Sequence, residues 1–323
     1  MVIFVVLFLA FCIVFVNGAT DAVNSVATCV SSGSMKMKNA VILSALFNFF
    51  GVSVMGAFFA DVAMTVKDTV YIENGDQAYL VLISCLSAVI LWSLSAWYFG
   101  LPTSESHGLI AALAGAGWAL HGISGLDTAQ LSKALLGVPL SSLAGFATGA
   151  VCVALVKRLP FGSDHKFYKA AQVIGCACMS FMHGGQDGLK LLGIFMIALG
   201  ADERMPVFYI AAVSLVMMIG TAVGGKRIIK TVGTDMVSLS YSEGFCADIS
   251  SAVCLFLFGI FGGIPASTTQ TKASAMIGAS LAGERSYVNG GIVKNMVSAW
   301  LFTFPVCFIL GAVIVRAGML VLY

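Results

Sequence analysis

Seven long apolar runs constrain this sequence more than any other feature. A helix needs about 20 consecutive apolar residues to cross the hydrocarbon core of a bilayer, and each run has roughly that length. Hydrophobic residues make up 59% of the chain and charged residues only 10%, against about 25% charged in soluble domains. We therefore predict a multi-pass protein embedded in a lipid bilayer, which excludes a soluble enzyme, a coiled coil and a disordered chain. The runs lie near 1–16, 40–60, 78–99, 134–156, 205–223, 245–261 and 292–316.

Three further segments, 100–120, 170–200 and 262–282, are apolar but interrupted. They are rich in Gly, Ser and Thr, and they carry Asp, Glu, Lys and His residues. Free backbone groups at membrane depth are tolerated only where protein or a water-filled cavity satisfies them. We therefore predict that these segments are broken or re-entrant helices that line a pathway.

The charges between the apolar runs predict the orientation of the chain, because Lys and Arg are retained on the cytoplasmic side. Basic clusters occur at 36–38, 157–169 and 226–230, whereas 61–76 and 202–203 are acidic. Following the chain through these loops places the N-terminus outside the cytoplasmic membrane. No basic run or aromatic stacking motif suggests a nucleic-acid partner. The nine cysteines lack the spacing of a zinc site, so we expect no metal bound by them.

The two halves of the sequence resemble each other. NGATDAVN at 17–24 matches HGGQDGLK at 183–190, and the aspartates of the two motifs are 166 residues apart. GLPTSESHGLIAALAGAG at 100–117 matches GIPASTTQTKASAMIGAS at 263–280, and their prolines are 163 residues apart. Two separate motifs at nearly the same offset indicate an internal repeat.

The repeat is inverted, because its first Asp motif runs from outside to inside and its second from inside to outside. Such repeats are typical of secondary transporters, in which discontinuous helices of both halves meet near the bilayer midplane. We predict an all-α polytopic membrane protein with two inverted-topology repeats, 1–160 and 161–323.

Asp21 and Asp187 are the first candidates for function. A charged side chain at bilayer depth costs about 2.5–3.5 kcal/mol on insertion, so it is retained where it is needed. We predict that both aspartates bind a coupling cation. The alternative is that each caps a half-helix by accepting hydrogen bonds from free N–H groups.

Two clusters of hydroxyl residues follow the prolines of the second motif. Each precedes an apolar helical pattern with small residues, which is the composition of a helix N-terminus. Two such N-termini that face each other would surround a tetrahedral oxyanion with neutral donors and positive dipole ends. The alternative is ordinary N-caps and close helix packing. The clusters are Thr103, Ser104 and Ser106, and Ser267, Thr268 and Thr269.

These motifs resemble those of the PiT family of inorganic phosphate transporters. Each half of that family carries N-D-x-x-N within GANDxAN, followed by P-x-S-T-[ST]-H at a helix start. The resemblance extends from Asn17 to about Pro305, and it includes 224–245, which is similar to a cytoplasmic stretch of the family. It implies an ion-coupled permease for phosphate uptake, acting as a homodimer and without a cofactor, and not an enzyme.

The resemblance also assigns residues by position. Asp21, Asn24 and Asp187 fall on the cation-binding motif, where the two aspartates would hold Na⁺. The hydroxyl clusters fall on the anion-binding motif. Its positions here are Ser104, Ser106, Ser267, Thr268 and Thr269.

Five positions depart from the family pattern. Thr20 stands where the family has Asn, and Gln186 and Lys190 replace both asparagines of the second motif. Glu105 replaces a Thr, and Gln270 replaces the second His. An ammonium at Lys190 would repel Na⁺, or would substitute for it as a fixed positive charge near the aspartate.

We therefore hypothesise that protons replace Na⁺ as the coupling ion, carried on Glu105, Asp21, Asp187 or His107. A buried carboxylate with a raised pKa is suited to carry a proton. We expect Glu105 and Lys190 to compensate each other's charge in the cavity. The alternative is that Lys190 reaches the membrane interface and Glu105 faces water. His107 contacts the anion or bridges helices.

Other functions were weighed against phosphate permeation. A sulfate permease of the same fold is the closest, because both substrates are tetrahedral oxyanions. A passive anion channel would need only the gradient of the anion itself. An intramembrane hydrolase using Ser104 or Ser106 with His107 lacks any GxSxG or HExxH motif.

Overall fold

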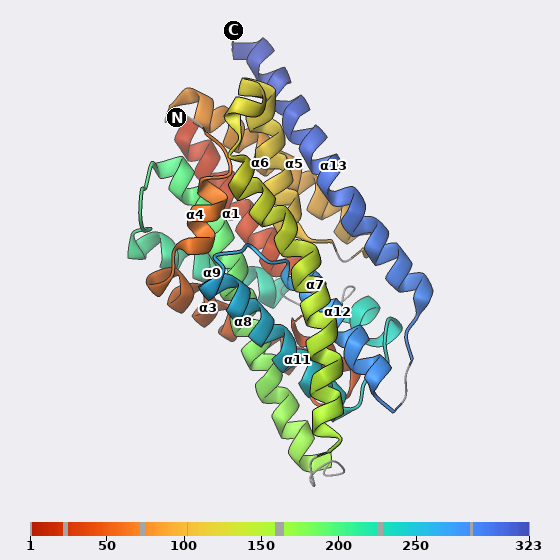
Figure 1. Cartoon of the computed structure of the whole chain (residues 1–323). Helices are drawn as coiled ribbons and strands as arrows, with labels where there is room; N and C mark the ends of the chain where they lie inside the picture. Colours follow the sequence, from red (N-terminus) through yellow and green to blue (C-terminus); the bar gives the residue numbers. More distant parts are fainter. Residues whose placement is uncertain are drawn as a thin grey trace.

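The computed structural model describes residues 2–21, 25–71, 75–101, 103–158, 165–224, 229–284 and 287–322, which form a bundle of α-helices (Figure 1). Within these ranges the extended pairing consists of two isolated β-bridges. Asn24 and residues 226–227 of the predicted basic cluster lie outside them. The helices are α1 (Val2–Thr20), α2 (Ala27–Ser31), α3 (Met37–Phe58), α4 (Asp61–Lys67), α5 (Asp76–Phe99), α6 (Glu105–His121), α7 (Thr128–Val156), α8 (His165–Leu199), α9 (Val207–Val223), α11 (Tyr241–Phe256), α12 (Thr268–Ala282) and α13 (Gly290–Leu322), with short turns η2 (Gly122–Gly125), η3 (Lys230–Asp235) and η4 (Leu257–Phe261).

Seven segments of the described chain are helical, long and apolar enough to cross a membrane. Six of the predicted apolar runs fall within such segments, and the remaining run, 205–223, forms the shorter apolar helix α9 of 17 residues. Large apolar side chains such as Phe4, Phe208 and Leu301 are more than two-thirds exposed on the outside of the bundle. The bundle therefore has the apolar surface of a multi-pass membrane protein. The segments are Val2–Thr20, Met37–Phe58, Asp76–Phe99, Glu105–Gly125, Thr128–Val156, Tyr241–Phe261 and Gly290–Leu320.

Helices α5 and α6 form a hairpin that enters and leaves the bundle on the same face. A β-bridge between Val70 and Leu126 joins the segment before α5 to the segment after α6. The chain reverses between the helices at Gly100, whose φ of 68° is a left-handed conformation that favours glycine. The interrupted segment 100–120 is therefore the tip and returning arm of a re-entrant hairpin, as predicted.

Helix α11, continued by the π-helical turn η4, forms the matching hairpin with α12 from the opposite face (Figure 1). A bridge between Val237 and Val288 joins its two ends, and Gly263 turns the chain with a φ of 53°. The two hairpin tips meet inside the bundle, where the hydroxyl oxygens of Ser104 and Ser267 are 2.9 Å apart.

Two of the predicted crossings are corrected by these hairpins. The runs 78–99 and 245–261 are long enough to cross a membrane, but each is the first arm of a hairpin. The bridged ends of each hairpin lie together and the two tips meet inside the bundle, so each run belongs to an antiparallel pair of helices. Length and composition do not distinguish such an arm from a full crossing.

The prediction of a broken helix at 170–200 is wrong, because α8 is one continuous helix of 35 residues. Its glycines allow close helix packing instead of a break. A Cβ at Gly184 would lie 2.4 Å from the carbonyl oxygen of Asn48 on α3, so only glycine fits this contact. The equivalent motif in the first half does interrupt the helix, since α1 ends at Thr20 and α2 begins at Ala27.

Equivalent helices pack in the same way in the two halves. Helix α3 of the first half packs on α8 of the second half, and α9 of the second half packs on α1 of the first in the same way. Likewise, α7 packs on α12, and α13 packs on α6. Within the halves, α8 packs on α11 as α1 packs on α5. Both termini lie at the same end of the bundle (Figure 1). The predicted fold class, an all-α membrane protein of two inverted repeats with re-entrant helices, is confirmed.

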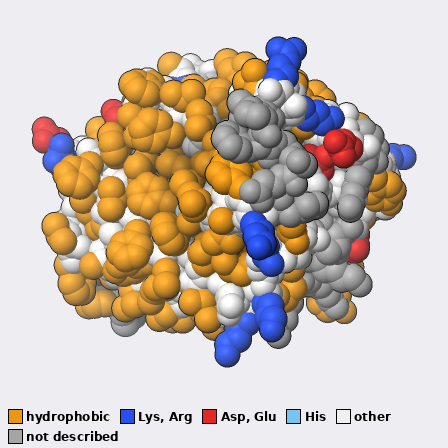
Figure 2. Space-filling model, turned by 90° about the horizontal axis from the view of Figure 1, so that it is seen from below, with side chains coloured by type: hydrophobic (Ala, Val, Ile, Leu, Met, Phe, Trp, Pro, Cys, Tyr) orange, Lys and Arg blue, Asp and Glu red, His pale blue; other side chains and the backbone are white. Residues whose placement is uncertain are grey.

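Basic residues gather at the end of the bundle away from the termini. Lys36 precedes α3 and Lys38 lies in its first turn, Lys157 and Arg158 follow α7, and Lys166 and Lys169 lie in the first turns of α8. Figure 2 shows this end, with Lys and Arg side chains over it and fewer Asp and Glu. Asp61 is the first residue of α4, and Asp202 lies in the connection between α8 and α9.

We predict that Gly51→Ala destabilises the bundle by about 1–3 kcal/mol, because the new methyl group would overlap packed backbone. A Cβ at Gly51 would lie 2.0 Å from the carbonyl oxygen of Phe181 and 2.8 Å from the amide nitrogen of Gly185. The unfolding temperature of the purified protein in detergent measures the effect. Gly290→Ala is the control, since nothing lies within 4 Å of its Cβ position. Equal unfolding temperatures for the two variants would contradict the close helix contact.

Candidate functional site

The predicted hydroxyl clusters meet at the two hairpin tips. Ser104 is the N-cap of α6 and accepts a hydrogen bond from the amide of His107, at 3.4 Å. Ser267 is the N-cap of α12 and accepts one from the amide of Gln270, at 3.2 Å. The serines therefore cap their helices, and the two helix N-termini face a common centre. Thr103 is buried beside this centre.

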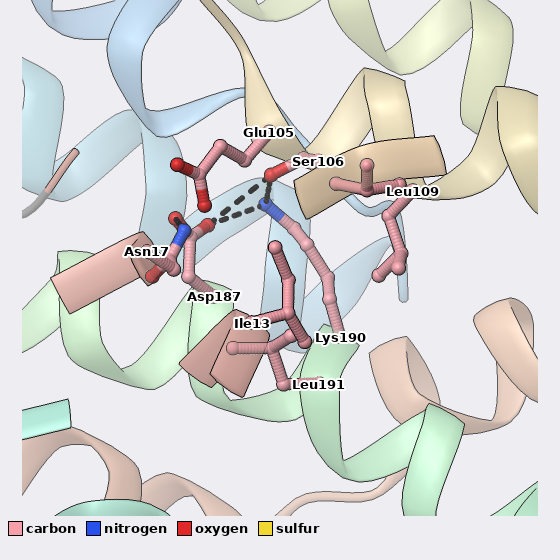
Figure 3. A pocket seen from close by; sticks show the side chains of 9 residues that line it. Ile13, Asn17, Glu105, Ser106, Leu109, Asp187, Lys190 and Leu191 are labelled. Atoms are coloured by element: carbon pink, nitrogen blue, oxygen red, sulfur yellow. Dashed lines mark hydrogen bonds and ion pairs between the residues drawn. The ribbon is translucent and has the colours of Figure 1, made fainter. Parts of the chain in front are cut away.

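Asp187 and Lys190, one turn apart on α8, form an ion pair at this centre (Figure 3). The Lys190 Nζ lies 2.8 Å from Asp187 Oδ1, 2.7 Å from the hydroxyl of Ser106 and 2.6 Å from the carbonyl oxygen of Ala266. Both side chains are almost completely buried. Lys190 therefore does not reach the membrane interface, and its ammonium bonds to three oxygen atoms of different kinds.

Asp187 also contacts residues of α1, of α12 and of α8 itself. Asn17 of α1 donates from Nδ2 to Oδ2 at 3.1 Å, and Thr268 of α12 donates from its hydroxyl at 3.3 Å. The Nε2 of His183, one turn earlier on α8, lies 3.3 Å from Oδ2. Asp187 thus joins residues of both halves of the chain.

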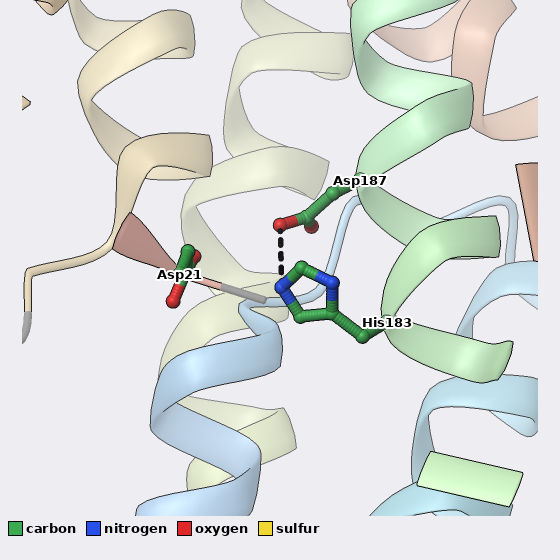
Figure 4. Close-up of side chains that lie close together, drawn as sticks. All are labelled: Asp21, His183 and Asp187. Carbon is green, nitrogen blue, oxygen red and sulfur yellow. Dashed lines mark ion pairs between the residues drawn. The ribbon is translucent and has the colours of Figure 1, made fainter. Parts of the chain in front are cut away.

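Asp21 lies close to His183 and Asp187 (Figure 4). The hydroxyl of Thr269 donates to its Oδ1. One donor atom from each of Asp21, His183 and Asp187 lies within 4.8 Å of the others, and all three side chains are buried. Two carboxylates and an imidazole at this spacing offer ligands for a cation or acceptors for protons.

Glu105 is buried and does not face water. The hydroxyl of Thr20 donates to its Oε1, whereas its Oε2 has no hydrogen-bond partner. Glu105 and Lys190 line the same cavity (Figure 3), but the ion pair of Lys190 is formed with Asp187. The Glu105 carboxylate is therefore left without a cationic partner among the described residues.

His107 bridges the two tips. Its Nδ1 lies 3.3 Å from Nε2 of Gln270, the residue that replaces the second His of the family motif. These two side chains line a separate apolar pocket of about 280 Å³ between α7 and α13, with Pro139, Trp300 and Phe304. Of the two roles predicted for His107, the structure shows the helix bridge.

The central cavity is small. It is lined by polar side chains, including Asn17, Glu105, Ser106 and Lys190, and by apolar residues of α1, α5 and α8 (Figure 3). Its volume of about 10 Å³ is room for about one water molecule. A tetrahedral oxyanion has five heavy atoms, so the tips must separate before one enters.

Three residues of the centre were not assigned from the sequence, namely Asn17, Thr20 and His183. A signal for two of them was present, because Asn17 precedes Asp21 by four residues, as His183 precedes Asp187. Residues four apart lie on the same face of a helix. The repeat alignment therefore contained these positions, although only the aspartates were singled out.

A buried charged centre between two re-entrant helix tips defines a membrane transporter. The chain belongs to the phosphate transporter family, because the family's sequence profile matches residues 17–167 and 160–311. That family consists of transporters and not of enzymes. The twofold match also agrees with the repeat seen in the sequence.

Known proteins similar to this chain cover nearly all of it. It is 32% identical over 309 residues to a probable low-affinity inorganic phosphate transporter of Bacillus subtilis, across 93% of this chain and 92% of that protein. It is 33% identical over 318 residues to a Rhizobium meliloti protein of the same description, across 95% and 93%. A solved structure described as the sodium-dependent phosphate transporter matches with a TM-score of 0.90, covering 99% of both chains at 21% identity, and shares the fold.

We predict that Asp21→Asn lowers phosphate uptake by about tenfold or more, because it removes a buried carboxylate charge within 4.8 Å of His183 and Asp187. Radiolabelled phosphate uptake into proteoliposomes measures the effect. Asp202→Asn is the matched control, since the Asp202 side chain is 94% exposed. Normal uptake by Asp21→Asn would show that this aspartate takes no part in transport.

Proposed function

We propose that this protein is a secondary active permease that imports inorganic phosphate across the cytoplasmic membrane, driven by a cation gradient. One observation supports this most directly: two hydroxyl-bearing helix N-termini meet beside Asp21 and Asp187. N-terminal N–H groups and hydroxyls bind a tetrahedral oxyanion, and the carboxylates bind the coupling cations. The relatives described as inorganic phosphate transporters favour phosphate as that anion.

The charges at the centre favour protons as the coupling ions. The described centre holds the carboxylates of Asp21, Glu105 and Asp187 against the ammonium of Lys190. Two positive charges are needed to balance it, and the anion adds further negative charge. Uncompensated charge is costly at membrane depth, so the anion enters together with positive charges.

Glu105 is the carboxylate best placed to carry one of these protons. Its Oε2 is buried without a partner, so protonation removes a buried charge and breaks no hydrogen bond at that oxygen. The titratable groups around it are Asp187 and Lys190, which line the same cavity, and Asp21 and His183 beyond them. His107 faces the other pocket.

Lys190 fills a cation position permanently. A carboxylate, a hydroxyl and a carbonyl oxygen surround its Nζ at 2.6–2.8 Å. Oxygens of these three kinds are the ligands that hard cations prefer. We therefore propose that Lys190 replaces Na⁺ near Asp187, and that exchangeable positive charge is left to Glu105 and Asp21.

Sulfate is the second candidate substrate. Monohydrogen phosphate carries one hydroxyl donor, whereas sulfate carries acceptors only. While Glu105 is ionised, its Oε2 can accept from such a donor, and this favours phosphate over sulfate.

The remaining assignments are part of the same proposal. We assign that face of the bundle to the cytoplasm and the N-terminus to the outside, because basic residues at 36–38, 157–158 and 166–169 lie at that face. Residues 1–160 and 161–323 form the two repeats, whose hairpins open alternately to either side. The exposed apolar surface faces lipid and, in part, a second copy of the chain in a homodimer.

We predict that an inward proton gradient drives phosphate uptake into proteoliposomes, and that a Na⁺ gradient at constant pH does not. Glu105→Gln should lower proton-driven uptake by about tenfold or more, because an amide carries no exchangeable charge. Glu203→Gln, at an exposed acid, should behave as wild type. Steep dependence of the wild type on Na⁺ at constant pH would refute proton coupling.

Lys190→Asn is expected to introduce Na⁺ dependence. The exchange removes the fixed ammonium and leaves Asp187 with oxygen ligands for a free cation. Na⁺, but not choline, should then raise both the unfolding temperature and the uptake rate of the variant, through preferential binding to the folded state. Lys38→Asn, at an exposed position, should show neither response. An unchanged response to Na⁺ in Lys190→Asn would contradict the replacement of a cation by Lys190.

A further inference from the structure

A second buried ion pair lies outside the centre. Lys272 of α12 and Asp248 of α11 are paired, and neither side chain has any exposed surface. The hydroxyl of Thr28 on α2 donates to both carboxylate oxygens of Asp248, at 2.7 and 3.0 Å. The Lys272 Nζ lies 3.4 Å from that hydroxyl. We call Thr28, Asp248 and Lys272 the inner triad.

The inner triad lies one helical turn from the centre. Lys272 follows Thr269, the donor to Asp21, by three residues along α12. From there α12 runs away from the tip toward Ala282 and the end of the bundle that carries the basic residues. The triad therefore lies between the centre and the face that we assign to the cytoplasm.

The equivalent positions in the opposite half of the chain carry no charge. By the offsets of the two repeat motifs, Lys272 corresponds to Leu109, Asp248 to Cys85 and Thr28 to Ile194. Leu109, Cys85 and Ile194 are all buried in the apolar core. The fold thus accommodates an apolar pair where the second half has charges. Since a buried ion pair seldom adds stability over a hydrophobic one, stability does not explain the triad.

Hydroxyl groups continue from the triad toward the centre. Ser25, three residues before Thr28, lies 3.0 Å from Ser44 Oγ and 2.9 Å from Ser180 Oγ. By the same offset, Ser25 corresponds to Leu191 and Ser180 to Val14, which are apolar. The inner half of the bundle is therefore polar at positions where the outer half is hydrophobic.

We propose that Lys272 and Thr28 form a second oxyanion-binding site, which phosphate occupies between the centre and the cytoplasmic face. The proposal rests on the function proposed above. An ammonium and a hydroxyl now bind the two oxygens of the Asp248 carboxylate, and two oxygens of phosphate present the same acceptors. Phosphate leaving the centre displaces the Asp248 carboxyl group, which takes up a proton as it leaves Lys272. When the anion is released, Asp248 loses this proton and pairs with Lys272 again.

Equilibrium binding of radiolabelled phosphate to the purified protein tests this site. The wild type should bind one phosphate per chain, because Asp248 competes at the inner triad. Asp248→Asn keeps Lys272 and Thr28 but removes the competing charge, and it should bind two. Asp202→Asn, at an exposed acid, should bind one. A single phosphate bound to Asp248→Asn overturns the proposal.

A double variant provides a second test in case Asp248→Asn does not fold. Asp248→Cys with Lys272→Leu installs the residues that the first half carries at these positions, so the packing has a precedent in this chain. It should bind one phosphate at the centre, while its uptake falls by about tenfold or more. Uptake at the wild-type rate overturns the proposal. A wild type that binds no phosphate instead refutes the proposed function, and the inner site with it.

Discussion

The rest of the structure depends on the buried ion pair between Asp187 and Lys190. Two charges taken out of water remain stable only when they are well paired and their other hydrogen-bonding positions are filled. Ser106 of one hairpin and the carbonyl group of Ala266 at the other fill those positions. The pair therefore holds both tips against α8, and the closed cavity between the tips follows from this arrangement.

The sequence was sufficient to place the hydroxyl clusters and both aspartates together, because two motifs shared one offset and an inverted repeat brings equivalent residues to one centre. It could not show that α8 is unbroken, since a glycine-rich stretch suits a break and a close helix contact equally. The pairing of Lys272 with Asp248 gave no signal, because the partners are 24 residues apart on different helices. The sequence also could not show that the side chain of His107 points toward Gln270, because only the tertiary structure brings these two residues together.

The two halves share a backbone plan but differ in their charges. The buried lysines Lys190 and Lys272 and the acid Asp248 all belong to the second half. Glu105 is the buried acid added in the first, at the hairpin tip that faces them. The two halves thus have equivalent backbones, but substitutions have given their buried positions different charges.

The β-bridges at the hairpin bases have a mechanical consequence. The backbone amide of Tyr71 donates to the carbonyl oxygen of Gly125 at 2.9 Å, and the backbone amide of Asn289 donates to that of Met236 at 2.8 Å. Each hairpin base is therefore held together by hydrogen bonding. A rigid arm fixed at one end swings most at its free end. A rotation of a few degrees at a base, too small to disturb the surrounding helices, is thereby amplified at Ser104 and Ser267, and each hairpin acts as a lever.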